Sequence, residues 1–281
     1  MTQNETPTSV PDSSPILLIG GTGKTGKRIA AQLREAGHEV RPASRNAQCR
    51  FSWTDQSTWA PALAGVRAIY LVQPPFDDAL VHMKPFFEQA RSSGAQRLVL
   101  LSAMGAAGPL LEAEQLVKDA FPEWTMLQPT WFSQNFHEDF FGQLVRTGHV
   151  RLPVGEAEVA FIDVDDIAAV AAAALTDSRH AGRSYELTGP RKLTFTEAIG
   201  EIAQATGRDI RFTPISEEEF RAEQLAAGLS EDVVELFCYL LADLREGSHS
   251  ETSDGVQQAL GRQPRDFSLY VRQAAASNSF N

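Results

Sequence analysis

The sequence has two cysteines, no long apolar run and no excess of positive charge. Cys49 and Cys238 lie far apart and lack the close spacing of zinc-binding or redox-active pairs, so we expect reduced thiols, no metal site and a cytoplasmic protein. The longest uncharged stretches, residues 98–111 and 124–137, are shorter than the roughly 18 apolar residues that a membrane span needs. Membrane binding is therefore not expected.

The charge balance is acidic, with 36 Asp and Glu residues against 25 Lys and Arg residues and a formal net charge of −11. Nucleic-acid binding usually requires clustered Lys and Arg, so no nucleic-acid partner is expected. The first residues lack the basic and apolar segments of a signal peptide, and we predict a flexible tail at residues 1–14. A hydrophobic content of 43% suffices for a globular core. Monomer and homodimer both remain open.

Short apolar runs alternate with helical patterns from Pro15 onward. The spacing predicts strands at residues 16–19, 38–43, 68–72, 97–102 and 124–128. The connections between these runs are long enough for crossover helices. This order is typical of the α/β class with a doubly wound parallel sheet, the Rossmann fold.

The alternation of strands and helices loosens after Pro129. We assign residues 15–281 to a single Rossmann domain, in which residues 131–150 and 177–281 contribute a small C-terminal substrate-binding lid. The pattern in this half predicts strands at 159–162, 185–188 and 210–212, and helices at 165–175, 195–206, 217–227, 231–244 and 266–276.

A glycine-rich turn follows the first predicted strand and opens a predicted helix. Its G-x-G-x-x-G pattern at Gly21, Gly23 and Gly26 permits a tight turn and a close approach of the backbone to a pyrophosphate. This context predicts a dinucleotide site, although a purely structural turn has the same spacing. A P-loop is disfavoured because Leu18 occupies a position that needs glycine. The predicted contacts are Gly20, Gly21, Thr22, Gly23, Lys24, Thr25 and Gly26.

The end of the second predicted strand indicates which dinucleotide binds. NAD-binding folds usually place an acidic residue there for the ribose hydroxyls, whereas an arginine can hold the 2′-phosphate of NADP. Ser44 and Arg45 stand at this strand end, and no acidic residue follows until Asp55. We therefore predict NADP(H), with Ser44 and Arg45 at the 2′-phosphate. The alternative for Arg45 is an ordinary solvated charge.

Three further strand ends supply candidate contacts, because ligands of doubly wound folds bind outside the carboxyl ends of parallel strands. The alternative is that these loops only cap the sheet. The candidate cofactor contacts are Gln73, Pro74, Pro75, Ser102, Ala103, Pro129, Thr130, Trp131 and Phe132.

Aromatic side chains gather after the last of these strands. Flat aromatic faces bind polycyclic, quinonoid or cationic ligands by stacking and by cation–π attraction. At least half of such residues are expected to lie in the core instead. The predicted partner is a small aromatic or cationic substrate, in contact with Met104, Trp131, Phe132, Phe136 and Tyr239.

Several segments resemble the atypical short-chain dehydrogenase/reductases of the NmrA-like kind. The similar segments are residues 16–46, 51–59, 70–75, 129–136 and 164–168. The segments PTWFSQNF and YLVQPP narrow the resemblance to the ergot-alkaloid reductases, the festuclavine and agroclavine dehydrogenases. This resemblance implies NADPH-dependent reduction of an iminium or a related conjugated carbon–nitrogen bond.

The sequence departs from the larger superfamily at the Tyr-x-x-x-Lys pair, whose tyrosine protonates a carbonyl oxygen. The motif LEAEQLV at residues 111–117 places Ala106 and Leu110 at the equivalent positions. Without an acid, reduction of an ordinary ketone would leave an alkoxide, whereas an iminium becomes neutral on accepting hydride. We therefore predict a preactivated acceptor, namely an iminium or imine, a quinone or a conjugated system. Ser102 and Thr130 would orient it.

Other interpretations remain open. An NADP(H)-binding, redox-sensing regulatory protein of the NmrA type, without turnover, would also lack the Tyr-Lys pair. His137 is a candidate proton donor for an ordinary carbonyl, although a structural role is more common for a lone histidine. Asp163, Asp165 and Asp166 resemble a carboxylate site, but their place before a predicted helix favours a role as helix-start acids.

Overall fold

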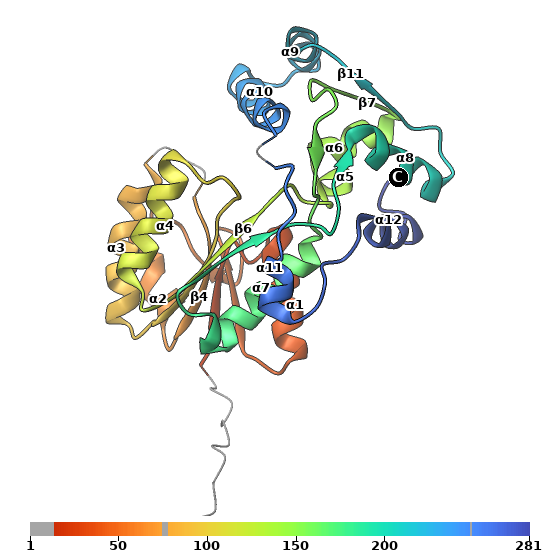
Figure 1. The fold of residues 1–281 in the computed structure, drawn as a ribbon. Helices are drawn as coiled ribbons and strands as arrows, with labels where there is room; N and C mark the ends of the chain where they lie inside the picture. The colour runs from red at the N-terminus through yellow and green to blue at the C-terminus, as the bar shows by residue number, and fades with distance from the viewer. Residues whose placement is uncertain (1–13, 75–77, 248) are drawn as a thin grey trace, which may run out of the picture.

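A seven-stranded parallel sheet forms the centre of the molecule (Figure 1). The computed structural model describes residues 14–74, 78–247 and 249–281, so residues 1–13 of the predicted tail and Pro75 lie outside it. The strand order is β3-β2-β1-β4-β5-β6-β9, which confirms the doubly wound α/β prediction. The strands are β1 (Ile16–Ile19), β2 (Val40–Ser44), β3 (Cys49–Arg50), β4 (Ala68–Val72), β5 (Arg97–Leu101), β6 (Glu123–Pro129) and β9 (Arg183–Leu187).

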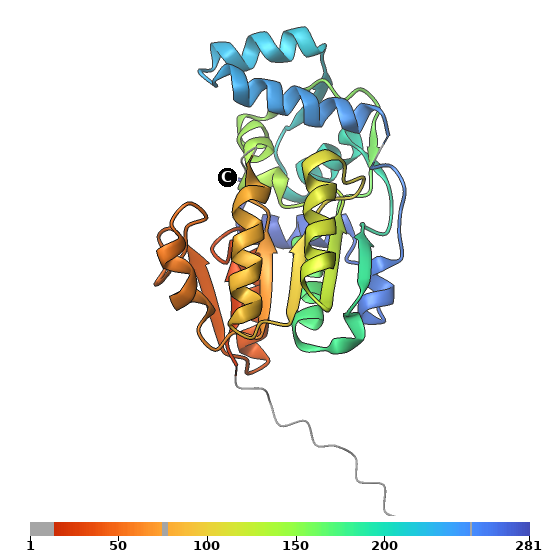
Figure 2. The ribbon, with the colours of Figure 1, turned by 90° about the vertical axis from the view of Figure 1, so that its left-hand side faces the viewer.

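Helices cover both faces of this sheet because successive side chains of each strand point to opposite faces. Leu17 and Ile19 of β1 pack with one set of helices, and Ile16 and Leu18 pack with the other. The first set is α2 (Trp59–Leu63), α3 (Ala79–Ser92) and α4 (Gly108–Ala120). Helices α3 and α4 lie in front of the sheet in Figure 2. The second set is α1 (Lys24–Glu35), α7 (Val164–Thr176) and α11 (Gly255–Leu260).

A second lobe lies beyond the carboxyl ends of the strands (Figures 1 and 2). It holds the parallel pair β7–β11 and the antiparallel pair β8–β10. Its elements are α5 (Asn135–Glu138), α6 (Phe140–Thr147), β7 (His149–Leu152), β8 (Glu158–Val159), β10 (Leu193–Thr194), α8 (Phe195–Thr206), β11 (Arg211–Pro214), α9 (Glu217–Ala226), α10 (Glu231–Arg245) and α12 (Phe267–Ala276). None of the described helices is long and apolar enough to cross a membrane.

Part of the predicted substrate lid belongs to the central sheet instead. Strand β9 pairs in parallel with β6, and α11 packs on the same face as α7. A short 3₁₀ helix, η1 (Gln56–Thr58), precedes α2, and a second one, η2 (Ser178–His180), precedes β9. The chain therefore leaves the sheet after β6, returns to form β9, and then completes the lobe.

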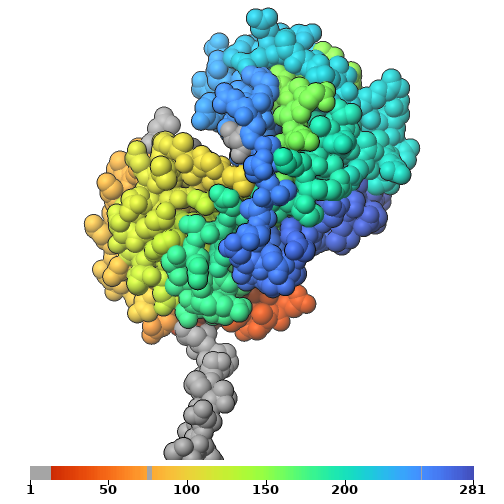
Figure 3. Space-filling model, in the orientation of Figure 1, coloured from red at the N-terminus to blue at the C-terminus, as the bar shows by residue number. Residues whose placement is uncertain are grey.

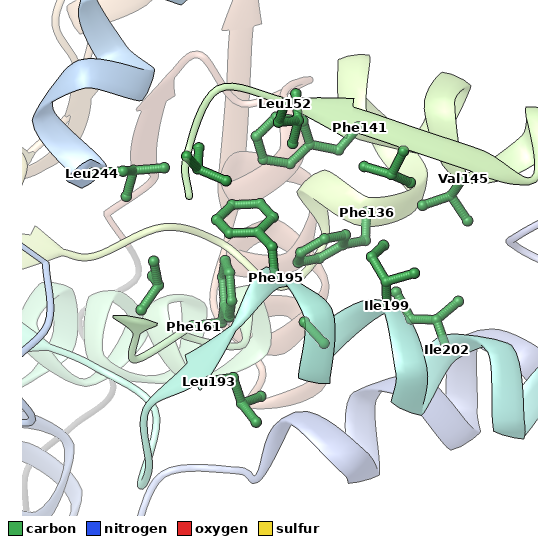
Figure 4. Close-up of a cluster of buried hydrophobic side chains, with 14 of the residues drawn as sticks. Phe136, Phe141, Val145, Leu152, Phe161, Leu193, Phe195, Ile199, Ile202 and Leu244 are labelled. Atoms are coloured by element: carbon green, nitrogen blue, oxygen red, sulfur yellow. The ribbon is translucent and has the colours of Figure 1, made fainter. Parts of the chain in front are cut away.

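The lobe has its own core of phenylalanine rings (Figure 4). Phe136 is fully buried there. Its ring centroid lies 5.1–5.9 Å from those of four other phenylalanines, and does not reach an open surface. These neighbours are Phe141, Phe161, Phe195 and Phe267. The prediction that Phe136 contacts substrate is therefore corrected, because aromatic spacing alone does not separate a core ring from a cleft ring.

The burial of Phe136 predicts a stability effect. Phe136→Ala should lower the free energy of unfolding by about 3–5 kcal/mol, because it removes a buried ring and leaves a cavity among rigid neighbours. Leu236 on α10 is 56% exposed, and Leu236→Ala is the control, with a change of about 0.5 kcal/mol or less. Urea denaturation measures both values. Similar losses in the two variants would contradict the core assignment.

Candidate active site

The glycine turn fits tightly between β1 and α1. Gly20 has a φ of +82°, a conformation that favours glycine. A Cβ on Gly21 would lie 2.7 Å from the carbonyl oxygen of Leu18, and a Cβ on Gly26 would overlap the carbonyl oxygen of Gly20. Helix α1 begins at Lys24. The turn therefore brings the first N–H groups of the helix, which have no intrahelical partners, close to the sheet edge.

A small pocket of about 310 Å³ extends from this turn along the end of β2. It contains the predicted residues Ser44 and Arg45, and no acidic residue is among the described residues that line it. Phe51 and Trp53 form its other wall, with ring centroids 5.1 Å apart. The sequence reasoning did not assign these two rings a contact, although they lie in a segment that resembles the family. The pocket offers aromatic surface and one cation beside the glycine turn.

A larger cleft of about 740 Å³ lies at the carboxyl ends of the strands, between the sheet and the second lobe. Figure 3 shows the molecular surface hollowed between α4 and α10. Eleven of the predicted residues line this cleft together, namely Lys24, Gln73, Pro74, Ser102, Ala103, Met104, Pro129, Thr130, Trp131, Phe132 and Tyr239.

Unpartnered polar atoms indicate what the cleft can hold. Gln73 Oε1 and Thr130 Oγ1 are buried and have no hydrogen-bond partner within the described parts of the chain. Both residues line the cleft next to the glycine turn. Buried polar atoms are normally hydrogen-bonded, so these two atoms fit a ligand that brings polar groups. Together with the glycine turn and the pocket at Arg45, these two polar atoms fit a bound dinucleotide.

Ser102 occupies the cleft floor at the end of β5. Its Oγ donates a hydrogen bond of 2.6 Å to Oε1 of Glu114, a residue of α4 that is only 1% exposed. Gln128 Nε2 donates to the same oxygen at 2.8 Å. The Nζ atom of Lys118 lies 3.5 Å from the other carboxylate oxygen. Sequence reasoning did not assign a role to Glu114, because its contact with Ser102 depends on how α4 packs against β5 and β6.

The two superfamily positions also face this cleft. Ala106 and Leu110, which the sequence predicts at the positions of the tyrosine and the lysine, both line it. Neither side chain can give a proton. The wall that they form with Pro109 and Met104 is apolar, and such a wall favours ligands with large apolar surfaces.

Lys24 is held by the opposite wall of the cleft. Its ammonium group pairs with Asp139 and donates a hydrogen bond of 2.6 Å to Asn135 Oδ1. The same ammonium lies 5.6 Å from the ring centroid of Phe132. A phosphate at the glycine turn would therefore compete with Asp139 for this cation. An acid from the second lobe therefore partly offsets the positive charge of Lys24 at the turn.

The cleft contains further residues that sequence reasoning missed. Asp243 and Leu240 come from α10, and His249 comes from the segment that follows it. Asp243 Oδ2 lies 2.6 Å from His249 Nε2. No local motif marks these positions, because they reach the cleft only through the docking of α10.

His137 lies outside the residues that line the cleft. Its Nδ1 atom is 2.7 Å from the hydroxyl of Tyr270, and its Nε2 atom is 3.3 Å from Glu138. The hypothesis that His137 donates a proton is therefore corrected in favour of a structural role. A histidine near an aromatic segment in sequence can point away from it in the fold.

Asp163 caps α7, and Asp165 and Asp166 lie in the first turn of that helix. Asp163 accepts a hydrogen bond from the N–H of Asp165, which confirms the helix-start interpretation. Arg265 lies 3.0 Å from Asp163 and 2.6 Å from Asp165, and Arg262 lies 2.7 Å from Asp166. The three acids therefore tie the segment after α11 to the central domain.

These features define a protein class. The strand order, the glycine turn and a cleft at the carboxyl ends of the strands are those of a dinucleotide-binding Rossmann protein. The model of the NAD(P)H-binding family matches residues 20–178. The chain belongs to this NAD(P)H-binding family, and relatives that it matches over nearly their whole length are named as an oxidoreductase, an NAD(P)H azoreductase and a dehydrogenase.

The sequence similarity to known relatives extends over nearly the whole chain. An uncharacterized oxidoreductase of Bacillus subtilis is 36% identical over 94% of this chain and 96% of its own length. The agroclavine dehydrogenase of Claviceps purpurea is 30% identical over 90% of this chain and 94% of its own length. The crystal structure of an NADPH-dependent quinone oxidoreductase of Escherichia coli shares the fold, with a TM-score of 0.81, 20% identity and coverage of 95% and 100%.

The pocket at Arg45 predicts how the protein discriminates between cofactors. Arg45→Ala should weaken NADPH binding about 10- to 100-fold, the range expected when a charge-assisted hydrogen bond worth about 1.5–3 kcal/mol is lost. NADH, which lacks the 2′-phosphate, is the internal control and should bind unchanged. Fluorescence titration with both cofactors measures the two affinities. A parallel loss of NADH and NADPH affinity would assign Arg45 another role.

The contacts of Glu138 predict that the link between α5 and α1 stabilises the fold less at low pH. Burial alone would raise the pKa of the Glu138 carboxyl, but hydrogen bonds from His137, Arg28 and Lys27 outweigh it and hold that pKa far below its usual range. A carboxyl group with a depressed folded-state pKa stabilises the fold above its unfolded pKa of about 4.3, and this contribution disappears as the pH falls toward the folded value.

Glu138→Gln should therefore be less stable than the wild type by about 1–3 kcal/mol at pH 7. The difference should shrink below about pH 4, where the Glu138 carboxyl of the unfolded chain takes up a proton while that of the folded chain stays ionised. Urea denaturation at intervals of about one pH unit between pH 2 and pH 7 measures this difference in the free energy of unfolding. Glu156 is exposed, and Glu156→Gln is the matched control. A constant difference between wild type and Glu138→Gln at all pH values would disprove the assignment.

Proposed function

We propose that the protein is an NADP(H)-dependent reductase that passes hydride to a preactivated acceptor, namely an iminium or imine, a quinone or a conjugated system. The main support is that Ala106 and Leu110 line the cleft where the superfamily places its tyrosine and lysine. An acceptor that becomes neutral, or that forms a delocalised anion, needs no strong acid beside it. The site therefore suits activated acceptors better than ordinary ketones.

The preference for NADP(H) is supported by the pocket beyond the glycine turn. Arg45 and Ser44 line the pocket in which the adenosine ribose of a bound dinucleotide would lie. The residues described in this pocket lack an acid that would repel a 2′-phosphate. An arginine in this place provides a planar donor group that matches phosphate geometry.

The chain's own residues would position the reactants. Bound NADPH supplies a hydride from its nicotinamide. Trp131 and Phe132 form the aromatic wall of the cleft, and Trp131 is itself held by stacking on Phe141, with ring planes 8° apart. Ser102 and Thr130 supply the polar groups that orient the acceptor. Met104 and Leu110 add apolar side chains to the same space.

The relatives are consistent with this proposal. The likeness to agroclavine dehydrogenase over 90% of the chain agrees with the iminium acceptors that the ergot-alkaloid resemblance implies. The shared fold with a quinone oxidoreductase is a reason to include quinones among the acceptors tested.

A panel of acceptors tests the function. NADPH oxidation followed by absorbance should occur with 3,4-dihydroisoquinolinium or 1,4-naphthoquinone and not with cyclohexanone, because only the ketone needs an acid. His137→Gln should keep this turnover, since His137 lies outside the cleft. Tight NADPH binding without oxidation by any acceptor would favour a redox-sensing regulatory protein. Efficient ketone reduction would contradict the proposed acceptor class.

A further inference from the structure

The hydrogen-bond network below the cleft floor fixes the direction of one proton. Glu114 Oε1 accepts from Ser102 Oγ at 2.6 Å and from Gln128 Nε2 at 2.8 Å. Lys118 Nζ approaches the other oxygen at 3.5 Å. The amide nitrogen and the ammonium group can only donate hydrogen bonds, and a carboxylate can only accept them.

This arrangement determines what Ser102 offers to a ligand. A serine hydroxyl has a single proton and two lone pairs. Its proton points to Glu114, so the lone pairs are what Ser102 retains for the cleft that it lines. The bond is charge-assisted and Glu114 is only 1% exposed, so water does not compete for the carboxylate. Ser102 is therefore held as a hydrogen-bond acceptor.

We propose that Glu114 is a positioning residue which holds Ser102 as a hydrogen-bond acceptor, and that the cleft thereby selects acceptors with an N–H group, above all protonated imines. This inference rests on the proposed reductase function and names the substrate class within it. Hydride adds to the iminium carbon, the electron pair of the C=N π bond becomes the lone pair of the amine nitrogen, and the N–H proton stays in place. No other proton is required.

The same geometry disfavours quinones at Ser102. Both oxygens of a quinone can only accept hydrogen bonds, so neither can pair with a hydroxyl that is itself held as an acceptor. An iminium nitrogen that carries a methyl group in place of hydrogen keeps the positive charge but loses the donor. Comparing these ligands therefore separates the hydrogen bond from simple charge attraction.

Binding to the full-length protein, measured by calorimetry with NADP⁺ present, tests the inference without requiring turnover. The probes are 3,4-dihydroisoquinolinium, its N-methyl derivative and 1,4-naphthoquinone, at a pH that keeps the imine protonated. Because the first two probes have the same charge, repulsion by the oxidised cofactor cancels in their ratio. The wild type should bind the N–H probe about tenfold more tightly than the N-methyl probe, as expected for one charge-assisted hydrogen bond.

Two variants of Glu114 and one control locate the origin of this preference. In Glu114→Leu the Ser102 hydroxyl is no longer held and can donate to the cleft as well as accept from it, so the ratio should fall by several-fold and naphthoquinone should bind more tightly. Glu112 lies on the same helix but is exposed, and Glu112→Gln should keep the wild-type ratio. Circular dichroism checks that each variant is folded.

Glu114→Gln keeps the shape of the side chain and removes its charge, so it decides the matter if Glu114→Leu does not fold. Its ratio should lie between those of Glu114→Leu and the wild type, because a neutral amide binds the Ser102 proton more weakly. An N–H preference that keeps its full wild-type size in both Glu114 variants would show that Glu114 does not produce it and would overturn the inference. So would the absence of a preference in the wild type. In either case, the acceptor panel above still tests the reductase function separately.

Discussion

The close contact between the first turn of α1 and the end of β1 is the constraint on which the site depends. Gly26 lies against the carbonyl of Gly20 with no space for a side chain. This contact directs the start of α1 toward the carboxyl edge of the sheet, where the strand ends gather the polar groups. A larger residue at this point would move the helix, and with it Lys24 and the entrance to both pockets.

The sequence predicted the helices and strands of both lobes better than the residues that meet in the cleft. The apolar run at residues 68–72 and the pattern at 195–206 coincide with β4 and α8, because local spacing determines such elements. The glycine turn is also local. Cleft residues such as Tyr239 could be proposed only from composition, and Asp243 could not be proposed at all, because the docking of a separate helix brings them to the cleft.

The aromatic segment shows this difference within a few residues. Trp131 and Phe132 line the cleft, whereas Phe136 is completely enclosed by the rings of the second lobe. Their sequence patterns look alike, and only the tertiary packing separates a ring that can contact a ligand from one that stabilises the lobe. Glu114 is a parallel case, since its helical spacing shows burial but does not show that Ser102 is its partner.

The position of β9 gives the second lobe a particular relation to the sheet. The chain builds part of the lobe after β6, returns to pair β9 with that same strand, and then builds most of the rest. The lobe thus consists of a segment between β6 and β9 and of most of the chain that follows β9. Its loops and helices can change in length or composition while the nucleotide-binding half is preserved. Evolution can therefore alter the acceptor in one module without redesigning the cofactor site in the other.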